Sequence, residues 1–259
     1  RRLMEKHTND LVNNLITYWR ERSISYGKQH LEELTGDTKV KWQDYLLQHL
    51  SLQSNRGNKV LDIGTGPGFL AILLAEKQFN VTAIDLTEEM LQQAKKNAAH
   101  LDNKIEWRLM NAEHLAFSDQ TFDVIVTRNL TWNLADPETA YREWYRVLKP
   151  GGILLNFDSN WYHYLFNEES RKKYFAARAM TKRLEVKDVY QETNISRMEE
   201  LVYQLPLSET NRPNWDTHVL AQQGFQQIET FEHLNDVLLN EVQKINLAFS
   251  SIFMIRAIK

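Results

Sequence analysis

Residues 59–69 carry the sequence K-V-L-D-I-G-T-G-P-G-F, in which a short apolar run stops at three alternate glycines, Gly64, Gly66 and Gly68. A helical pattern, F-L-A-I-L-L-A-E-K, follows at residues 69–77. Glycines permit a tight turn and a close approach of a ligand to the backbone, and the free amides that open a helix favour an anionic group. The stretch therefore predicts a strand, a ligand-binding loop and a helix.

Strand and helix patterns continue to alternate along the chain. Further strands are predicted at residues 80–86, 105–109, 122–127, 153–158, 225–232 and 251–258, and helices at residues 87–100 and 137–148, with Thr87 as a candidate cap. Strands that alternate with helices form a parallel sheet covered on both faces. We therefore expect an α/β fold with a doubly wound, mostly parallel, seven-stranded sheet.

Two regions fall outside this alternation. Apolar residues at helical spacing predict N-terminal helices at residues 9–26 and 37–49, the second opened by Asp37. After the fifth strand, residues 159–216 are rich in aromatic and charged residues, with a helical period around 168–185, and a helix follows at 218–223. We expect one domain, composed of an N-terminal helical cap (1–55), a cofactor-binding core (56–158), a substrate-cover insertion (159–216) and a final helix with strands (217–259).

An acidic residue, Asp85, ends the second predicted strand, about 20 positions after the glycines. A carboxylate there can accept hydrogen bonds from ribose hydroxyls, so the ligand should contain adenosine. The dinucleotide pattern G-x-G-x-x-G requires a third glycine where Phe69 stands. An NAD site is therefore disfavoured.

The stretch V-L-D-I-G-T-G-P-G-F, with Asp62 two residues before the first glycine, resembles the first motif of the class I S-adenosylmethionine-dependent methyltransferases of the small-molecule type. Asp85 in V-T-A-I-D-L looks like that family's ribose-binding acid. N-A-E-H-L-A-F-S-D-Q-T-F-D resembles its adenine loop, with Asn111 where many members carry Asp. The likeness extends to T-R-N-L-T-W-N-L and Y-R-V-L-K-P-G-G-I-L-L and covers about residues 18–158.

The resemblance implies a Rossmann-like methyltransferase fold with S-adenosyl-L-methionine as cofactor. It implies a cofactor site formed by Asp62, Gly64, Thr65, Gly66, Gly68, Asp85, Leu86, Asn111, Ala112, Glu113 and Arg128, with Tyr18 and Tyr26 closing over it. Alternative interpretations remain for some of these residues. Asp62 could hold the loop by accepting backbone amides, and Tyr18 and Tyr26 could be core aromatics of an amphipathic helix.

The chemistry that the resemblance implies is methyl transfer from a sulfonium, leaving S-adenosylhomocysteine. A general base is needed only if the acceptor atom carries a proton. Asp158 and His163, just beyond the fifth strand, are the candidate catalytic residues, although His163 could simply pack among aromatics. A basic run is either a solvated helix face or an attraction for an anionic acceptor; it comprises Arg171, Lys172, Lys173, Arg178, Lys182 and Arg183.

Composition and net charge limit the classes of molecule with which the protein is expected to interact. A net charge of −3 provides no basic footprint for nucleic acid, and R-N-L-T-W-N stands where base methyltransferases carry N-P-P-Y or D-P-P-Y. No apolar run reaches the roughly 18 residues of a membrane span, and we expect a cytoplasmic protein without a membrane partner. The absence of cysteine excludes thiol-dependent methylation of pyrimidine carbon or arsenite, and no metal site is expected.

Three functions remain open. The first is methylation of a small-molecule acceptor at oxygen, nitrogen or carbon. The second is an NAD(P)-dependent oxidoreductase, and the third is a non-catalytic S-adenosylmethionine-binding protein. Thermal stabilisation by S-adenosylhomocysteine separates the first from the second.

Overall fold

The computed structural model describes residues 2–50 and 57–259. Seven strands form one sheet in the order β3-β2-β1-β4-β5-β7-β6, and β7 runs antiparallel to both of its neighbours. The strands are β1 (Lys59–Ile63), β2 (Asn80–Asp85), β3 (Ile105–Leu109), β4 (Phe122–Arg128), β5 (Leu148–Asp158), β6 (Gln226–Phe231) and β7 (Phe253–Ile258). The predicted doubly wound, mostly parallel sheet is confirmed.

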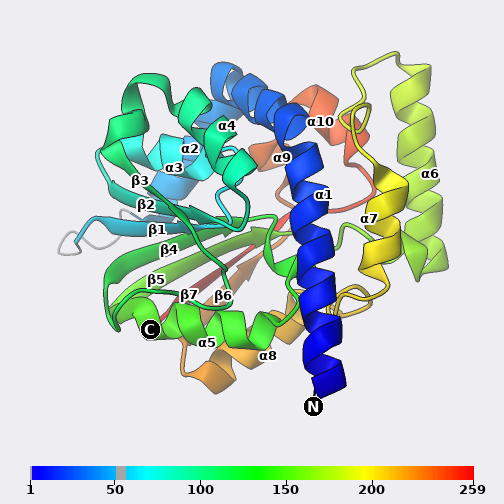
Figure 1. The fold of residues 1–259 in the computed structure, drawn as a ribbon. Coiled ribbons are helices and arrows are strands. Elements are labelled where there is room, and N and C mark those ends of the chain that lie inside the picture. The colour runs from blue at the N-terminus through cyan, green and yellow to red at the C-terminus, as the bar shows by residue number, and fades with distance from the viewer. Residues whose placement is uncertain (1, 51–56) are drawn as a thin grey trace.

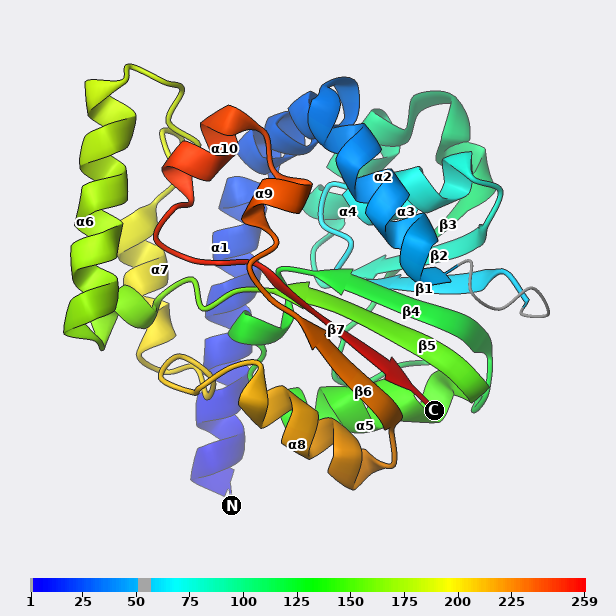
Figure 2. The ribbon, with the colours of Figure 1, turned by 180° about the vertical axis from the view of Figure 1, so that it is seen from behind.

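Helices cover both faces of the sheet (Figure 1, Figure 2). One face carries α2 (Asp37–Leu50), α3 (Phe69–Glu76) and α4 (Glu88–Ala98), and the other carries α5 (Pro137–Val147) and α8 (Asn214–Gln223). Residues 69–75 of α3 are all buried, because α3 packs in one apolar cluster with the strands and with Trp42 and Leu46 of α2. This double contact explains why α3 is apolar on every side.

The register of the central strands brings their carboxyl ends to one edge. Asp62 pairs with Ala83 and Ile63 with Ile84, so β1 and β2 end side by side. The Thr65 amide then donates to the Ile84 carbonyl over 2.9 Å. The glycine loop and Asp85 consequently meet at the edge of the sheet where open α/β folds bind ligands.

Two helix starts differ in their capping. Asp136 caps α5 by accepting a hydrogen bond of 3.0 Å from the Thr139 amide. Thr87 occupies the N-cap position of α4 as predicted, but its side chain makes no capping bond. Its hydroxyl donates to Asp85 over 3.1 Å instead, because the carboxylate lies within reach of it. The threonine therefore supports the strand end and not the helix.

The first helix, α1 (Arg2–Thr35), is much longer than the predicted 9–26. It continues through Gly27, where a Cβ would lie 2.7 Å from the side chain of Gln93 on α4. The glycine thus allows α1 to approach α4 closely. Figures 1 and 2 both show α1 standing between the sheet and the pair α6 (Glu168–Arg183) and α7 (Ile195–Val202).

The segment 159–216 contains α6, α7, the short turn η3 (His163–Leu165) and the start of α8. It joins the N-terminal helix through a third apolar cluster, formed by Leu11, Leu15 and Tyr18 of α1 with Met198, Leu201, Val202 and Leu205. Two further short helices, α9 (Asn235–Leu238) and α10 (Glu241–Asn246), were not predicted. The predicted boundary between residues 55 and 56 lies outside the described residues.

Two 3₁₀ turns complete the fold, η1 (Ala99–Lys104) after α4 and η2 (Thr131–Asn133) after β4. Within residues 2–50 and 57–259, no helix is both long enough and apolar enough to cross a membrane.

Candidate active site

The glycine loop after β1 combines close packing on one side with open space on the other. A Cβ on Gly64 would lie 2.7 Å from the Leu130 side chain, so a larger residue cannot fit there. On Gly66, with φ of +53°, the nearest atoms to a Cβ would be Tyr26 at 3.7 Å and His30 at 3.9 Å. Gly66 therefore borders a cavity beneath α1, where a ligand can approach the backbone.

Asp62 holds the loop from inside. Its buried Oδ2 accepts hydrogen bonds from the Thr65 hydroxyl at 2.7 Å and from the Ala71 amide at 3.1 Å. Desolvation by burial raises the pKa of this carboxyl to about 7. The predicted alternative, that Asp62 stabilises the loop by accepting amides, describes these contacts.

Asp85 connects the loop to the second strand. Its Oδ2 accepts a hydrogen bond of 2.8 Å from the Gly66 amide, and its Oδ1 accepts one of 3.0 Å from the Thr87 amide. Burial raises the pKa of Asp85 although these bonds oppose the shift. The side chain still borders the cavity, so Asp85 both fixes the loop and lines the pocket.

All but two of the predicted cofactor residues line this one pocket. It is bordered by Asp62, Gly64, Thr65, Gly66, Asp85, Leu86, Asn111, Ala112, Glu113, Arg128 and Tyr26. Gly68 does not line it, because a Cβ there would lie 3.0 Å from Ala94 of α4, and the glycine serves that packing. Tyr18 is buried in the α1–α7 cluster and borders a neighbouring cavity instead.

The loop after β3 is braced by its own side chains. Asn111 Oδ1 accepts a hydrogen bond of 2.9 Å from the Glu113 amide, and Glu113 Oε1 accepts one of 2.8 Å from the Asp136 amide. Glu113 is buried, and desolvation raises its pKa. These bonds fix the wall of the pocket next to Asp85 and Leu86.

His30 and Glu33 of α1 were not predicted, yet both contact Arg128 at the end of β4. Arg128 Nη1 and Nη2 donate to the two carboxylate oxygens of Glu33 at 3.0 and 3.1 Å, and Nη2 lies 3.0 Å from His30 Nε2. The guanidinium also lies 4.1 Å from the centroid of the Phe69 ring. A helix extended beyond residue 26 places Tyr26, His30 and Glu33 on one face, since they are four and three residues apart.

This contact determines the tautomer of His30. A guanidinium nitrogen can only donate, so Nε2 must accept and the ring proton resides on Nδ1. His30 is 3% exposed, and burial together with the charge of Arg128 lowers its pKa well below the usual value. Nδ1 has no hydrogen-bond partner among the described residues, and His30 borders the cofactor pocket. A residue of the pocket wall thus carries a buried N–H donor without a partner among the described residues.

A larger cavity of about 430 Å³ adjoins this pocket. Four residues line both spaces: Trp19, Tyr26, Arg128 and Asn129. Its wall includes many aromatic side chains, among them Trp132, Trp161, Tyr162, Tyr164, Tyr174, Tyr190 and Phe249, as well as charged and polar ones. The smaller space is therefore the candidate cofactor pocket, and the larger one that meets it is the candidate acceptor cavity.

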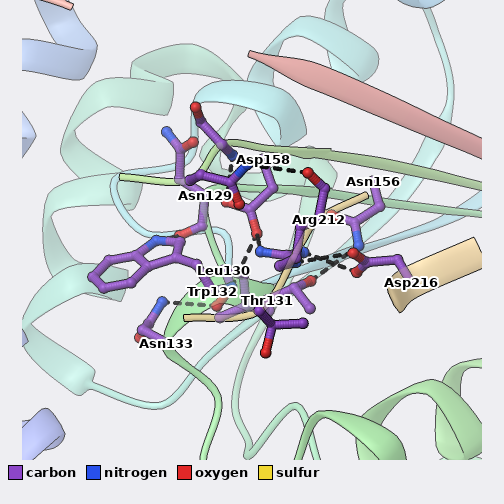
Figure 3. Close-up of polar contacts among 12 residues, drawn as sticks. Asn129, Leu130, Thr131, Trp132, Asn133, Asn156, Asp158, Arg212 and Asp216 are labelled. Carbon is purple, nitrogen blue, oxygen red and sulfur yellow. Dashed lines mark hydrogen bonds and ion pairs between the residues drawn. The ribbon is translucent and has the colours of Figure 1, made fainter. Parts of the chain in front are cut away.

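The structure places Asp158, a predicted catalytic residue, in a buried ion pair. Its side chain is fully buried, and Oδ2 accepts hydrogen bonds from Arg212 at 2.6 Å and from the Trp132 amide at 2.9 Å. Arg212 lies between Asp158 and Asp216, as Figure 3 shows. Asp158 borders neither pocket, because its oxygens are used to hold the loop after β4.

His163 also lies outside both pockets. Its Nε2 is 3.0 Å from the Thr210 carbonyl, and the ring borders a separate hollow with Ser170 and Lys173. Desolvation lowers the pKa of His163. Because His163 lines neither of the two spaces, the structure gives no support to its predicted role as a general base.

The basic run of α6 forms an exposed surface. Lys172 and Lys173 pair with Glu168 and Glu169 at 3.0 and 2.9 Å, one helical turn away, and all four side chains are largely exposed. Neither they nor Arg171, Arg178, Lys182 and Arg183 line the acceptor cavity. These contacts fit the solvated-face alternative for the run, and an anionic acceptor stays a prediction.

Comparisons with known proteins agree with this geometry. A family described as "Methyltransferase domain" matches residues 61–156. Ubiquinone biosynthesis O-methyltransferase of Alkalilimnicola ehrlichii is 33% identical over 126 residues, which cover 48% of this chain and 50% of that protein. Ubiquinone/menaquinone biosynthesis C-methyltransferase of Rickettsia bellii is 34% identical over 158 residues, covering 57% and 55%. The chain spans about half the length of these curated relatives.

Solved structures share the fold. Phosphoethanolamine N-methyltransferase 2 of Haemonchus contortus, in complex with S-adenosyl-L-methionine, aligns with a TM-score of 0.63 at 17% identity, covering 92% of this chain and 58% of that one. Geranyl diphosphate C-methyltransferase of Streptomyces coelicolor aligns with a TM-score of 0.54 at 14% identity, covering 85% and 78%. Residues 61–156 thus resemble a methyltransferase domain, and the chain shares its fold with S-adenosylmethionine-dependent methyltransferases of known structure.

Proposed function

We propose that this protein transfers a methyl group from S-adenosyl-L-methionine to a small-molecule acceptor and releases S-adenosylhomocysteine. The observation that carries the proposal is the junction of two spaces, a pocket beside the glycine loop and an aromatic cavity, at Trp19, Tyr26, Arg128 and Asn129. The bound cofactor supplies an electrophilic methyl group. The residues of the junction align the acceptor with it and exclude water.

The pocket has polar groups suited to each part of the cofactor. Asp85 stands at the end of β2, where it can accept hydrogen bonds from ribose hydroxyls, and Asn111 to Glu113 form the adjoining wall. The His30 ring lies at the other end, with its Cε1 3.9 Å from a Cβ on Gly66, and its Nδ1–H has no partner among the described residues. It is suited to donate to the methionine carboxylate of the cofactor, because a buried donor without a partner is unfavourable until a ligand accepts from it.

The enclosure of the acceptor cavity favours a small molecule over a macromolecule as the methyl acceptor. Its walls come from α1, from residues 161–195 and from residues 239–252, which surround the space on several sides. Nucleic acid is not proposed as the acceptor, and a cytoplasmic location stays a prediction of the sequence. The two curated relatives are named for methylation at oxygen and at carbon, so the atom methylated here is left open.

The two other functions receive less support. The family match is to a methyltransferase domain, and Phe69 stands where a dinucleotide fold needs glycine, so an NAD(P)-dependent oxidoreductase is not favoured. A non-catalytic binding protein has no need of a second cavity that opens onto the cofactor pocket.

Calorimetry and a transfer assay test the proposal. S-adenosylhomocysteine and S-adenosyl-L-methionine should bind, NAD should not, and a panel of phenols, amines and acidic methylene compounds should include an acceptor whose mass rises by one methyl group. Binding of NAD without binding of S-adenosylhomocysteine would contradict the proposal. Binding of S-adenosyl-L-methionine without turnover of any compound in the panel would favour the non-catalytic alternative.

A further inference from the structure

Arg22 of α1 is a buried cation whose hydrogen-bond partners are all neutral. It is 8% exposed, and its guanidinium donates to the Ser25 hydroxyl and to Gln29 Oε1. Its Cζ lies 5.1 Å from the centroid of the Tyr26 ring. Arg22 borders the acceptor cavity and does not border the cofactor pocket.

The other charged side chains of the cavity wall are matched in pairs. Four pairs account for them: Glu33 with Arg128, Glu32 with Lys187, Glu192 with Lys28, and Asp188 with Arg178. Arg22 is the one cation of this wall without an ion pair to a carboxylate in residues 2–50 and 57–259. Burial of an unpaired charge is unfavourable, so a guanidinium in this position favours an anionic partner.

The guanidinium has donors left for such a partner. It carries five N–H groups, and the bonds to Ser25 and Gln29 use two of them. Both partners are anchored in turn, since Gln29 Nε2 donates to the Val189 carbonyl at 2.7 Å and the one proton of the Ser25 hydroxyl can be donated to the Arg22 carbonyl at 3.2 Å or to the Glu192 carbonyl at 3.3 Å. Arg22 is therefore held in place before a ligand arrives, which lowers the entropy lost on binding.

We propose that Arg22 binds an oxyanion, a carboxylate or a phosphate, carried by the methyl acceptor. The inference rests on the proposed function and narrows its acceptor to an anionic compound. A planar guanidinium matches either oxyanion through paired N–H groups. Because Arg22 lies one helical turn before Tyr26, which borders both spaces, the oxyanion is held on the acceptor side of the junction.

The test measures anion binding to the protein saturated with S-adenosylhomocysteine. Benzoate and inorganic phosphate serve as probes, and benzamide is the neutral match of benzoate. At least one of the two anions should bind the parent protein, with benzamide about tenfold weaker than benzoate if benzoate is the anion bound. The comparison within the parent protein requires no mutation, so it does not depend on the folding of a variant.

Variants then locate the binding. Arg22→Gln should lower the affinity for the anion by about tenfold. Arg22→Lys should retain part of this affinity, because it keeps the charge without the paired donors. Lys28→Gln is the matched control, since it removes a cation from the same wall that is exposed and paired with Glu192 at 3.9 Å. It should leave anion binding unchanged, and all three variants should bind S-adenosylhomocysteine like the parent.

Several results would overturn the inference. They are the binding of neither anion, equal affinity for benzoate and benzamide when benzoate is the only anion bound, and anion binding that survives in Arg22→Gln. Each leaves the proposed methyl transfer intact as long as S-adenosylhomocysteine binds. Failure of S-adenosylhomocysteine to bind the parent protein counts against the proposed function instead. In that case the anion titration is carried out on the protein without S-adenosylhomocysteine.

Discussion

Arg128 Nη2 lies 3.0 Å from His30 Nε2, and this contact joins the end of the fourth strand to the helix that covers the cofactor pocket. The arginine is also paired with Glu33 from the same helix, so its charge is balanced within the protein. The group of this cluster without a partner among the described residues is therefore the neutral Nδ1–H of His30 and not a free cation. This makes His30 the residue of α1 to test for recognition of the cofactor.

His30→Ala should weaken the binding of S-adenosylhomocysteine by about tenfold or more, because it removes a buried donor to a carboxylate. The affinity for 5′-methylthioadenosine, which lacks the amino-acid part, should not change. Calorimetry with both ligands measures the difference. His30→Asn can place an amide donor near the Nδ1 position and should retain more affinity than His30→Gln. An equal loss for both ligands would show that His30 only packs against Tyr26.

Gly66→Val should abolish cofactor binding, because its side chain would project into the cavity beneath Tyr26 and His30. The backbone at Gly66 also has positive φ, so the substitution adds strain, and a control must share that strain. Gly151→Val provides it: φ is +75° and no atom lies within 4 Å of the added Cβ. Both variants should lose stability, and only Gly66→Val should lose affinity in calorimetry. Similar affinities in the two folded variants would mean that the loop is structural alone.

Asp62→Asn should change how stability depends on pH. The carboxyl has an ordinary pKa of 3.8 and one of about 7 in the folded protein, so the folded state binds more protons between these values. Its contribution to the free energy of unfolding therefore falls as pH rises from 3.8 to 7, by roughly 4 kcal/mol in total. Asparagine does not titrate.

The unfolding free energies of Asp62→Asn and the parent protein, measured at several pH values, give the check on Asp62. The difference, variant minus parent, should increase with pH across this window and level off above it. Other titrating groups are common to both proteins and cancel from the difference. A difference that does not vary with pH would mean that Asp62 ionises normally in its buried position.

Much of the sheet could be predicted, because its central strands are buried on both faces and appear as continuous apolar runs. The glycine loop and Asp85 could be placed for a related reason. Parallel strands end at one edge, so residues that follow two neighbouring strands must meet there. Sequence spacing alone thus located most of the cofactor pocket.

The contribution of α1 was harder to predict. Its last third, residues 24–35, has few apolar residues, because that part borders cavities and presents polar groups to them. The spacing of apolar residues therefore predicts too short a helix. His30 and Glu33 lie beyond the predicted end and were not expected at the site for this reason. Arg22 lies within the predicted helix, but the cavity that it lines also involves residues 187–193, which come from far along the chain.

Asp158 illustrates a different difficulty. A carboxylate at the end of a strand in an α/β sheet has the same local sequence whether it meets a substrate or a buried cation. Its partner Arg212 lies 54 positions later, in a segment without a strand pattern. Only the three-dimensional arrangement distinguishes a structural ion pair from a catalytic acid.

The last prediction therefore concerns Asp158, whose removal should affect folding more than chemistry. Asp158→Ala leaves Arg212 buried with Asp216 as its one remaining carboxylate partner and leaves the Trp132 amide without its acceptor. Loss of one member of a buried ion pair costs about 3–5 kcal/mol. Asp158→Asn keeps the shape and should cost less, because its amide oxygen can still accept from Trp132.

Glu169→Ala breaks an exposed ion pair with Lys173 and serves as the control, with no measurable change in stability expected. Denaturant unfolding measures all three variants. If Asp158→Ala were as stable as the parent protein, bound S-adenosyl-L-methionine equally well and yet transferred no methyl group, Asp158 would be a catalytic residue after all.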